Sequence, residues 1–80
     1  MNILSSNGRT LINYDNVTAL RMFQKTDDSN KWAIISVYQN GSYDVITSFG
    51  TEYECQNVFD KLCGRIVKCW KHDIIDLGDL

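Results

Sequence analysis

Hydrophobic and polar residues alternate along two stretches of this 80-residue chain, and such alternation is typical of β-strands with one buried face. One stretch runs over residues 31–39 and the other over residues 42–49. Asn40-Gly41 lies between them, and this dipeptide favours a two-residue type I′ turn because both residues tolerate a positive φ. The pattern therefore predicts an antiparallel β-hairpin.

The N-terminal part of the chain gives a second hairpin signal. Asn7-Gly8 predicts another tight turn, between two short strands. Asp15-Asn16 predicts a bend, and residues 17–24 predict a further strand. Because short connections join consecutive strands, we expect residues 1–50 to form an antiparallel meander.

The pattern changes to a helical period after Gly50. The segment Thr51-Glu-Tyr-Glu54 has the hydroxyl and the carboxylate of a capping box, which satisfies the first backbone N–H groups of a helix. Apolar residues then recur every three or four positions, which predicts a helix over residues 51–71 with one apolar stripe. The stripe consists of Cys55, Val58, Phe59, Leu62, Ile66, Cys69 and Trp70.

These elements predict an α+β fold, in which an antiparallel sheet of four or five strands carries one long C-terminal helix packed across one face. We expect residues 1–80 to form a single domain, because the chain is short and contains no proline to mark a linker. Residues 72–80 form an acidic and aliphatic tail. Three placements are open to it: an added strand, a cover over the free sheet face, or a segment that becomes ordered on a partner.

The predicted strand over residues 32–38 has two apolar faces. Alternation divides its side chains into two sets, Ala33, Ile35 and Val37 on one face and Trp32, Ile34 and Tyr38 on the other. One helix covers only one face of a sheet, so the other face is left for the tail, a second copy of the chain or another protein. We expect the set that contains the aromatic residues to lie on the uncovered face.

Composition and charge restrict the function further. The apolar fraction of 44% and the charged fraction of 22% are typical of a folded globular protein. A net charge of −2 is too small to indicate a nucleic-acid partner or a DNA mimic. No apolar run is long enough to cross a membrane, and the N-terminus lacks the features of a signal peptide. The odd number of cysteines then indicates reduced thiols, and hence the cytoplasm.

The candidate chemistry is sparse. Cys69 and His72 are spaced closely enough to share a metal ion, but a structural zinc site needs four ligands and no second pair is present. A cysteine nucleophile, Cys63 or Cys69, would need His72 as a base and a third group to orient it, and the sequence offers none. We therefore expect no enzymatic activity, no cofactor and no metal.

Three basic residues of the predicted helix, Lys61, Arg65 and Lys68, follow one another at helical spacing. We call them the basic ridge. Such a ridge contacts phosphate groups or an acidic partner, or it forms an ordinary solvated helix face. Its charge is reduced by Asp60 and by the acidic tail.

The segment Gly8-Arg-Thr-Leu-Ile-Asn-Tyr-Asp-Asn-Val17, followed by a hairpin and by Thr51-Glu-Tyr-Glu54, Val58-Phe59 and Leu62, resembles small uncharacterised proteins of Firmicutes bacteria, their phages and mobile elements. The resemblance covers most of the first 67 residues, and the longer helix and the tail depart from it. It implies a bacterial cytoplasm and a small binding protein. Short phage proteins of this kind include inhibitors of host machinery, among them anti-CRISPR proteins. No catalytic residue carries over.

The sequence thus leads to the hypothesis of a non-enzymatic protein-binding module that inhibits a host protein such as a CRISPR nuclease. Its expected partner-binding residues are Trp32, Ile34, Tyr38, Lys61, Arg65 and Lys68. The aromatic residues would anchor the partner, and the basic ridge would orient it. The alternative is a nucleic-acid-binding accessory protein that uses the basic ridge. A homodimer through the free sheet face is compatible with both hypotheses.

Overall fold

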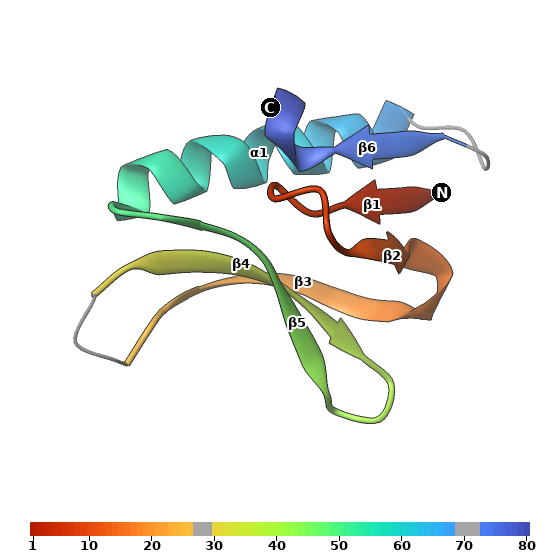
Figure 1. Ribbon diagram of the computed structural model, residues 1–80, viewed down its shortest axis with the longest axis horizontal. Coiled ribbons are helices and arrows are strands. Elements are labelled where there is room, and N and C mark those ends of the chain that lie inside the picture. The colour runs from red at the N-terminus through yellow and green to blue at the C-terminus, as the bar shows by residue number, and fades with distance from the viewer. Residues whose placement is uncertain (27–29, 69–72) are drawn as a thin grey trace.

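The computed structural model describes residues 1–26, 30–68 and 73–80, and its fold class is α+β (Figure 1). The elements follow the chain in the order β1 (Asn2–Leu4), β2 (Leu11–Asn13), the 3₁₀ helix η1 (Tyr14–Asn16), β3 (Val17–Gln24), β4 (Trp32–Tyr38), β5 (Tyr43–Phe49), α1 (Glu52–Lys68), β6 (Ile74–Asp76) and the 3₁₀ helix η2 (Leu77–Asp79).

The strands form two three-stranded sheets, and the expectation of a single sheet of four or five strands is wrong. The first sheet has the order β2-β1-β6 and the second β3-β4-β5. The chain changes sheet at η1, where the Asn13 side chain accepts a hydrogen bond from the Asp15 N–H at 3.0 Å and starts a turn that a continuous meander lacks. A hydrogen bond of 3.1 Å from the Ser6 N–H to the Ile46 carbonyl still joins the two sheets.

Both Asn-Gly turns occur where the sequence predicts them, but in a different conformation. Gly8 and Gly41 have φ values of 71° and 86°, whereas neither preceding asparagine has a positive φ. The Asn40 side-chain oxygen accepts bonds from the backbone and hydroxyl of Ser42 at 3.0 and 2.6 Å. Because this bonding fixes the asparagine, the hairpin closes through a three-residue loop with glycine in the left-handed position, and the type I′ prediction is wrong.

Helix α1 begins where the capping signal predicts it. The Thr51 hydroxyl accepts a hydrogen bond of 3.2 Å from the Glu54 N–H, which satisfies one of the first four N–H groups. The helix is described as far as Lys68, so the predicted extension to residue 71 lies outside the described residues. Cys55 and Leu62 are fully buried, and together with Val58, Phe59 and Ile66 they form the predicted stripe within the described part of the helix.

Both sheets and the helix contribute to the core. The first sheet supplies Ile3, Ile12 and Ile75, the second supplies Ile34 and Ile46, and α1 and η2 add Cys55, Leu62 and Leu77. Helix α1 lies along one face of the second sheet, and the first sheet lies beside it (Figure 1).

The tail adds a strand, one of its three expected placements. Strand β6 pairs in parallel with β1, with Ile75 opposite Ile3 in the core. Of the connection between α1 and β6, residues 69–72 fall outside the described residues, and the Asp73 carbonyl accepts a hydrogen bond of 3.0 Å from the Asn2 N–H. Because the two strands are parallel, the N-terminus lies at the start of β1 and the C-terminus lies beyond the opposite end of the pair, after β6 (Figure 1).

Candidate functional site

Helix α1 and the first sheet together cover the face of the second sheet that carries Trp32, Ile34 and Tyr38. Ile34 is fully buried in the core, and Trp32 and Tyr38 are partly buried against it. Our expectation that this set lies on the uncovered face is therefore wrong. Alternation separates the two sets correctly, but both sets are apolar, and packing against α1 decides which one is covered.

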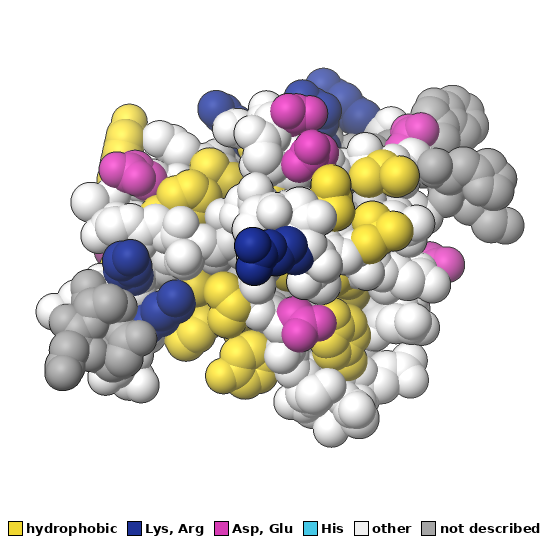
Figure 2. All heavy atoms as spheres, viewed as in Figure 1, with side chains coloured by type: hydrophobic (Ala, Val, Ile, Leu, Met, Phe, Trp, Pro, Cys, Tyr) yellow, Lys and Arg dark blue, Asp and Glu magenta, His cyan; other side chains and the backbone are white. Residues whose placement is uncertain are grey.

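The opposite face of the second sheet is left uncovered by the helix, and we call it the outer face. The register places seven apolar side chains on it: Ala19, Phe23, Ala33, Ile35, Val37, Tyr43 and Val45. Tyr43 and Val45 are 56% and 45% exposed, which is high for apolar side chains on a sheet. Figure 2 shows hydrophobic side chains on the lower part of the molecule, where Figure 1 has β3, β4 and β5.

An aromatic pair organises the outer face. The rings of Phe23 and Tyr43 meet edge to face, with centroids 6.4 Å apart and an angle of 73° between the planes. Such pairs contribute about 0.5–1.5 kcal/mol beyond the area that they bury. Because the two residues belong to the outer strands β3 and β5, their contact crosses β4 in the region of Ile35, which is only 9% exposed.

The rim of the outer face is basic. A shallow depression of about 260 Å³ is lined by Phe23, Tyr43, Val45, Lys25 and Thr26. Arg21 lies on the same face of β3, opposite Ile35, and is exposed. An apolar centre with cations at its edge is suited to an apolar anchor that carries neighbouring acidic groups.

The basic ridge is brought together as the sequence predicts. Lys61, Arg65 and Lys68 are exposed and line one groove of about 410 Å³ along α1. Gly64 lies between them, and Asp79 and Leu80 form the facing wall. The groove therefore has more positive than negative charge, although Asp79 weakens its attraction for an anion.

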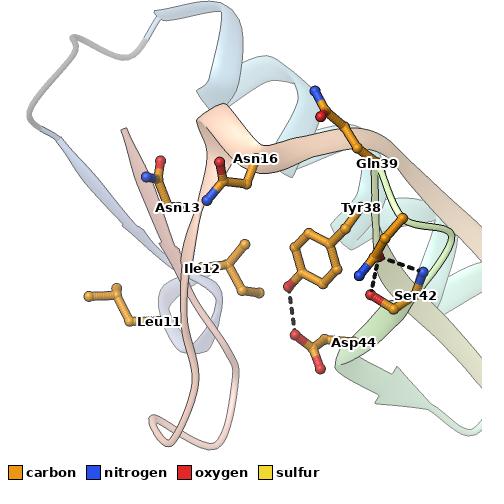
Figure 3. A pocket seen from close by; sticks show the side chains of 9 residues that line it. Leu11, Ile12, Asn13, Asn16, Tyr38, Gln39, Ser42 and Asp44 are labelled. Atoms are coloured by element: carbon orange, nitrogen blue, oxygen red, sulfur yellow. Dashed lines mark hydrogen bonds between the residues drawn. The ribbon is translucent and has the colours of Figure 1, made fainter.

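A third concave region is polar and lies between the two sheets (Figure 3). It has a volume of about 600 Å³ and is lined by Leu11, Ile12, Asn13, Asn16, Tyr38, Gln39, Asn40, Ser42 and Asp44. In Figure 3 the β2 side chains approach it from one side and those of the β4–β5 hairpin from the other. Its lining contains four side-chain amides and no basic residue, so it is suited to a neutral hydrogen-bonding group.

Hydrogen bonds in this polar groove hold the Tyr38 ring in place between Ser36 and Asp44. The Tyr38 hydroxyl donates to Asp44 Oδ2 at 2.6 Å and accepts a bond of 3.2 Å from the Ser36 hydroxyl. Burial raises the pKa of Tyr38, and the hydrogen bond to Asp44 and its negative charge raise it further. A tyrosine that acts as a base or nucleophile needs a lowered pKa, so this arrangement favours positioning of the ring over catalysis.

The cysteines differ in environment. Cys55 is buried, and burial followed by the charge of Glu52 raises the pKa of its thiol, whereas Cys63 is exposed. A buried thiol with a raised pKa is poorly nucleophilic. Cys69 and His72, the pair considered for a metal or a thiol nucleophile, lie outside the described residues. Within residues 1–26, 30–68 and 73–80, no three cysteine, histidine or acidic side chains are grouped closely enough to hold a metal ion.

Comparison with protein-family models, with curated proteins and with solved structures found no match. In the part of the chain that the structure describes, no helix has the length and apolar character required to cross a membrane.

Sequence reasoning missed Phe23, Tyr43 and Val45 as candidate site residues. Each belongs to a predicted strand, but their convergence on one face depends on the register of β3, β4 and β5. An irregularity between Ile34 and Ile35 shifts that register within the β4–β5 pair, and no signal in the sequence predicts it.

Proposed function

We propose that the protein is a non-enzymatic binding module whose outer face receives a protein partner. The observation that carries this proposal is the apolar outer face, where Tyr43 and Val45 are exposed and Tyr43 forms an edge-to-face pair with Phe23. Exposed apolar patches surrounded by polar residues mark interaction surfaces in small folded proteins. The basic rim, Arg21 and Lys25, favours a partner segment that presents an apolar side chain next to acidic ones.

The experiment compares the wild-type chain with a Tyr43→Ala, Val45→Thr variant as baits in a bacterial lysate treated with nuclease. Both side chains are about half exposed, so the variant stays folded by circular dichroism. The matched control is Tyr53→Ala, because Tyr53 is a tyrosine that is 76% exposed on α1. We expect a stoichiometric partner that binds the wild type and the control, and binds the outer-face variant more than roughly tenfold less tightly.

Retention of that partner by the outer-face variant would refute the assignment of the surface. Loss of the partner with the Tyr53 control would move the surface to α1. Recovery of the bait alone, with a doubled mass in light scattering that the outer-face variant abolishes, would identify a second copy of the chain on that face.

A narrower proposal is that the chain comes from a phage or mobile element and inhibits a host protein such as a CRISPR nuclease in the bacterial cytoplasm. Its support is the resemblance of the turn and capping motifs alone. A plasmid-interference assay tests it, because expression of the chain then restores transformation of a targeted plasmid. Unchanged interference across the CRISPR types assayed would refute inhibition of these nucleases.

A second candidate function is binding of a polyanion such as nucleic acid by the basic ridge. The observation that favours it is the shared groove of Lys61, Arg65 and Lys68. Each phosphate contact contributes to the salt dependence of the affinity, so binding that uses all three cations has a slope of about −2 to −3 in log K against log salt. Binding that does not respond to salt, or that survives Lys61→Ala, Arg65→Ala, would refute this function.

A further inference from the structure

Strand β3 has one free edge. It lies at the edge of the second sheet, next to β4. Four residues of β4 are buried, whereas every residue of β3 keeps accessible surface. β3 is also the longest strand that the structure describes, with 8 residues.

The register shows which backbone groups of β3 lack a partner. The Lys25 N–H donates to the Lys31 carbonyl at 2.8 Å, and hydrogen-bonded pairs alternate with non-bonded pairs in an antiparallel ladder. Phe23 and Arg21 therefore bond to β4, opposite Ala33 and Ile35. The other side of β4 agrees, because Tyr38 bonds to Ser42 of the β5 hairpin.

The intervening residues Leu20, Met22 and Gln24 consequently direct their N–H and carbonyl groups away from β4. Within the described residues, none of these groups has a hydrogen-bond partner in the protein. A row of unpaired groups of this kind is a template for another extended strand.

We propose that β3 pairs with β3 of a second copy of the chain, antiparallel, around a two-fold axis at Met22. Met22 then lies opposite Met22 of the second copy, and Leu20 lies opposite Gln24 of the second copy. Both backbone groups of all three residues find partners, and the second sheets of the two copies become one continuous sheet. The two helices lie on the same side of this sheet, and the two outer faces form one surface on the other side.

The positions of Arg21 on β3 and of Lys25 just after it favour the register with Met22 on the axis. With Met22 on the axis, Arg21 lies opposite Phe23 of the second copy, where a cation and an aromatic ring attract each other. An axis at Arg21 would place Arg21 opposite Arg21 of the second copy, and an axis at Phe23 would place Arg21 opposite Lys25 of the second copy. Like charges placed opposite each other are destabilising. A shift of two residues leaves Leu20 or Gln24 outside the paired segment.

This pairing goes beyond the proposed function and does not depend on it. The outer face can receive a protein partner in the monomer as well as in the dimer, because the edge of β3 is separate from Tyr43 and Val45 on β5.

Disulfide trapping tests the register. Met22→Cys is made in the full chain with Cys63→Ser and Cys69→Ser, and the matched variants are Leu20→Cys and Gln24→Cys in the same background. Opposite residues of a hydrogen-bonded pair have Cα atoms about 5.5 Å apart, within the range that a disulfide spans. The two Leu20 residues, and likewise the two Gln24 residues, are offset by roughly 13 Å along the strands.

We expect mild oxidation to cross-link Met22→Cys at least about tenfold faster than either matched variant, because only the two cysteines at position 22 lie close enough for a disulfide. Equal cross-linking of all three variants, or cross-linking of Leu20→Cys or Gln24→Cys alone, would overturn the proposal.

Light scattering provides a second test that involves no cysteine. Gln24→Pro removes an outward N–H from an exposed residue and leaves the bonds between β3 and β4 intact, and Gln24→Ala is its control. We expect the wild type and Gln24→Ala to dimerise, and Gln24→Pro to remain folded and dimerise more than roughly tenfold more weakly. A wild type that stays monomeric at millimolar concentration, or a Gln24→Pro variant that dimerises like the wild type, would refute the pairing.

Discussion

Substitution of Ile34 distinguishes the observed sheet orientation from the one that the sequence suggested. Ile34 has no exposed surface and packs in the core cluster with Ile46 and Leu62. Ile34→Ala removes three buried carbon atoms, each worth about 0.8 kcal/mol of transfer free energy, and leaves a cavity that adds to the cost. We expect the free energy of unfolding to fall by about 3–4 kcal/mol, and by about 1 kcal/mol for the milder Ile34→Val.

The assay is urea unfolding followed by circular dichroism, with the slope m compared between variants to confirm that the same surface is exposed on unfolding. The control is Val67→Ala, since Val67 is 85% exposed on α1 and its truncation changes the stability by less than about 0.5 kcal/mol. Ile34→Val keeps the test measurable if the alanine variant does not fold.

On the orientation that the sequence suggested, Ile34 is a surface anchor, and its truncation weakens binding with little effect on folding. A loss of less than about 1 kcal/mol for Ile34→Ala would therefore refute the observed packing. It would also return the candidate site to the face of Trp32 and Tyr38.

Three further predictions concern the turns, the thiols and the pH dependence. Gly41 has a φ of 86°, so Gly41→Ala lowers the free energy of unfolding in urea by about 1 kcal/mol. Gly64 lies inside α1 with no atom near the added carbon, so Gly64→Ala raises it by up to about 1 kcal/mol. Equal changes in the free energy of unfolding for the two variants would contradict this prediction. In thiol labelling followed by peptide mass spectrometry, we expect exposed Cys63 to be modified well before Cys55, because Cys55 is buried and its pKa is raised. Labelling of both thiols of the native chain at the same rate would refute the burial of Cys55. The raised pKa of Tyr38 contributes stability that is complete below its ordinary value of 10.0 and is lost as the pH rises through the folded-state pKa. Tyr38→Phe therefore weakens the pH dependence of stability above pH 10, and an unchanged dependence would count against the raised pKa that burial and the Asp44 hydrogen bond produce.

Local patterns in the sequence predict the single elements of this fold well. The capping signal at Thr51 locates the start of α1, and Gly8 and Gly41 occupy the left-handed positions of their turns. These features depend on neighbouring residues alone, which explains why the sequence is sufficient to predict them.

The division into two sheets and the identity of the outer face are not local properties. Strand β6 pairs with β1 from the other end of the chain, and the sequence offers a short apolar segment with several equivalent placements. Ile34 and Ile35 are equally apolar neighbours, so only the packing of α1 against the sheet makes one of them core and the other part of a candidate interface. The basic ridge could be predicted, because its residues share one helix and its period.

The parallel pairing of β1 with β6 has a mechanical consequence. A force applied through the residues before β1 and after β6 pulls two adjacent parallel strands in opposite directions along their length, because one strand is held at its start and the other at its end. Their hydrogen bonds are then loaded together rather than broken one after another, and forced unfolding is governed by the rate of this step. Single-molecule pulling from the two ends should meet a higher force than pulling from residue 1 and an attachment at Asn40, in the β4–β5 loop. In that case the short pair of β1, the central strand of its sheet, and β6, an edge strand, sets the resistance of the whole molecule to force applied at its two ends.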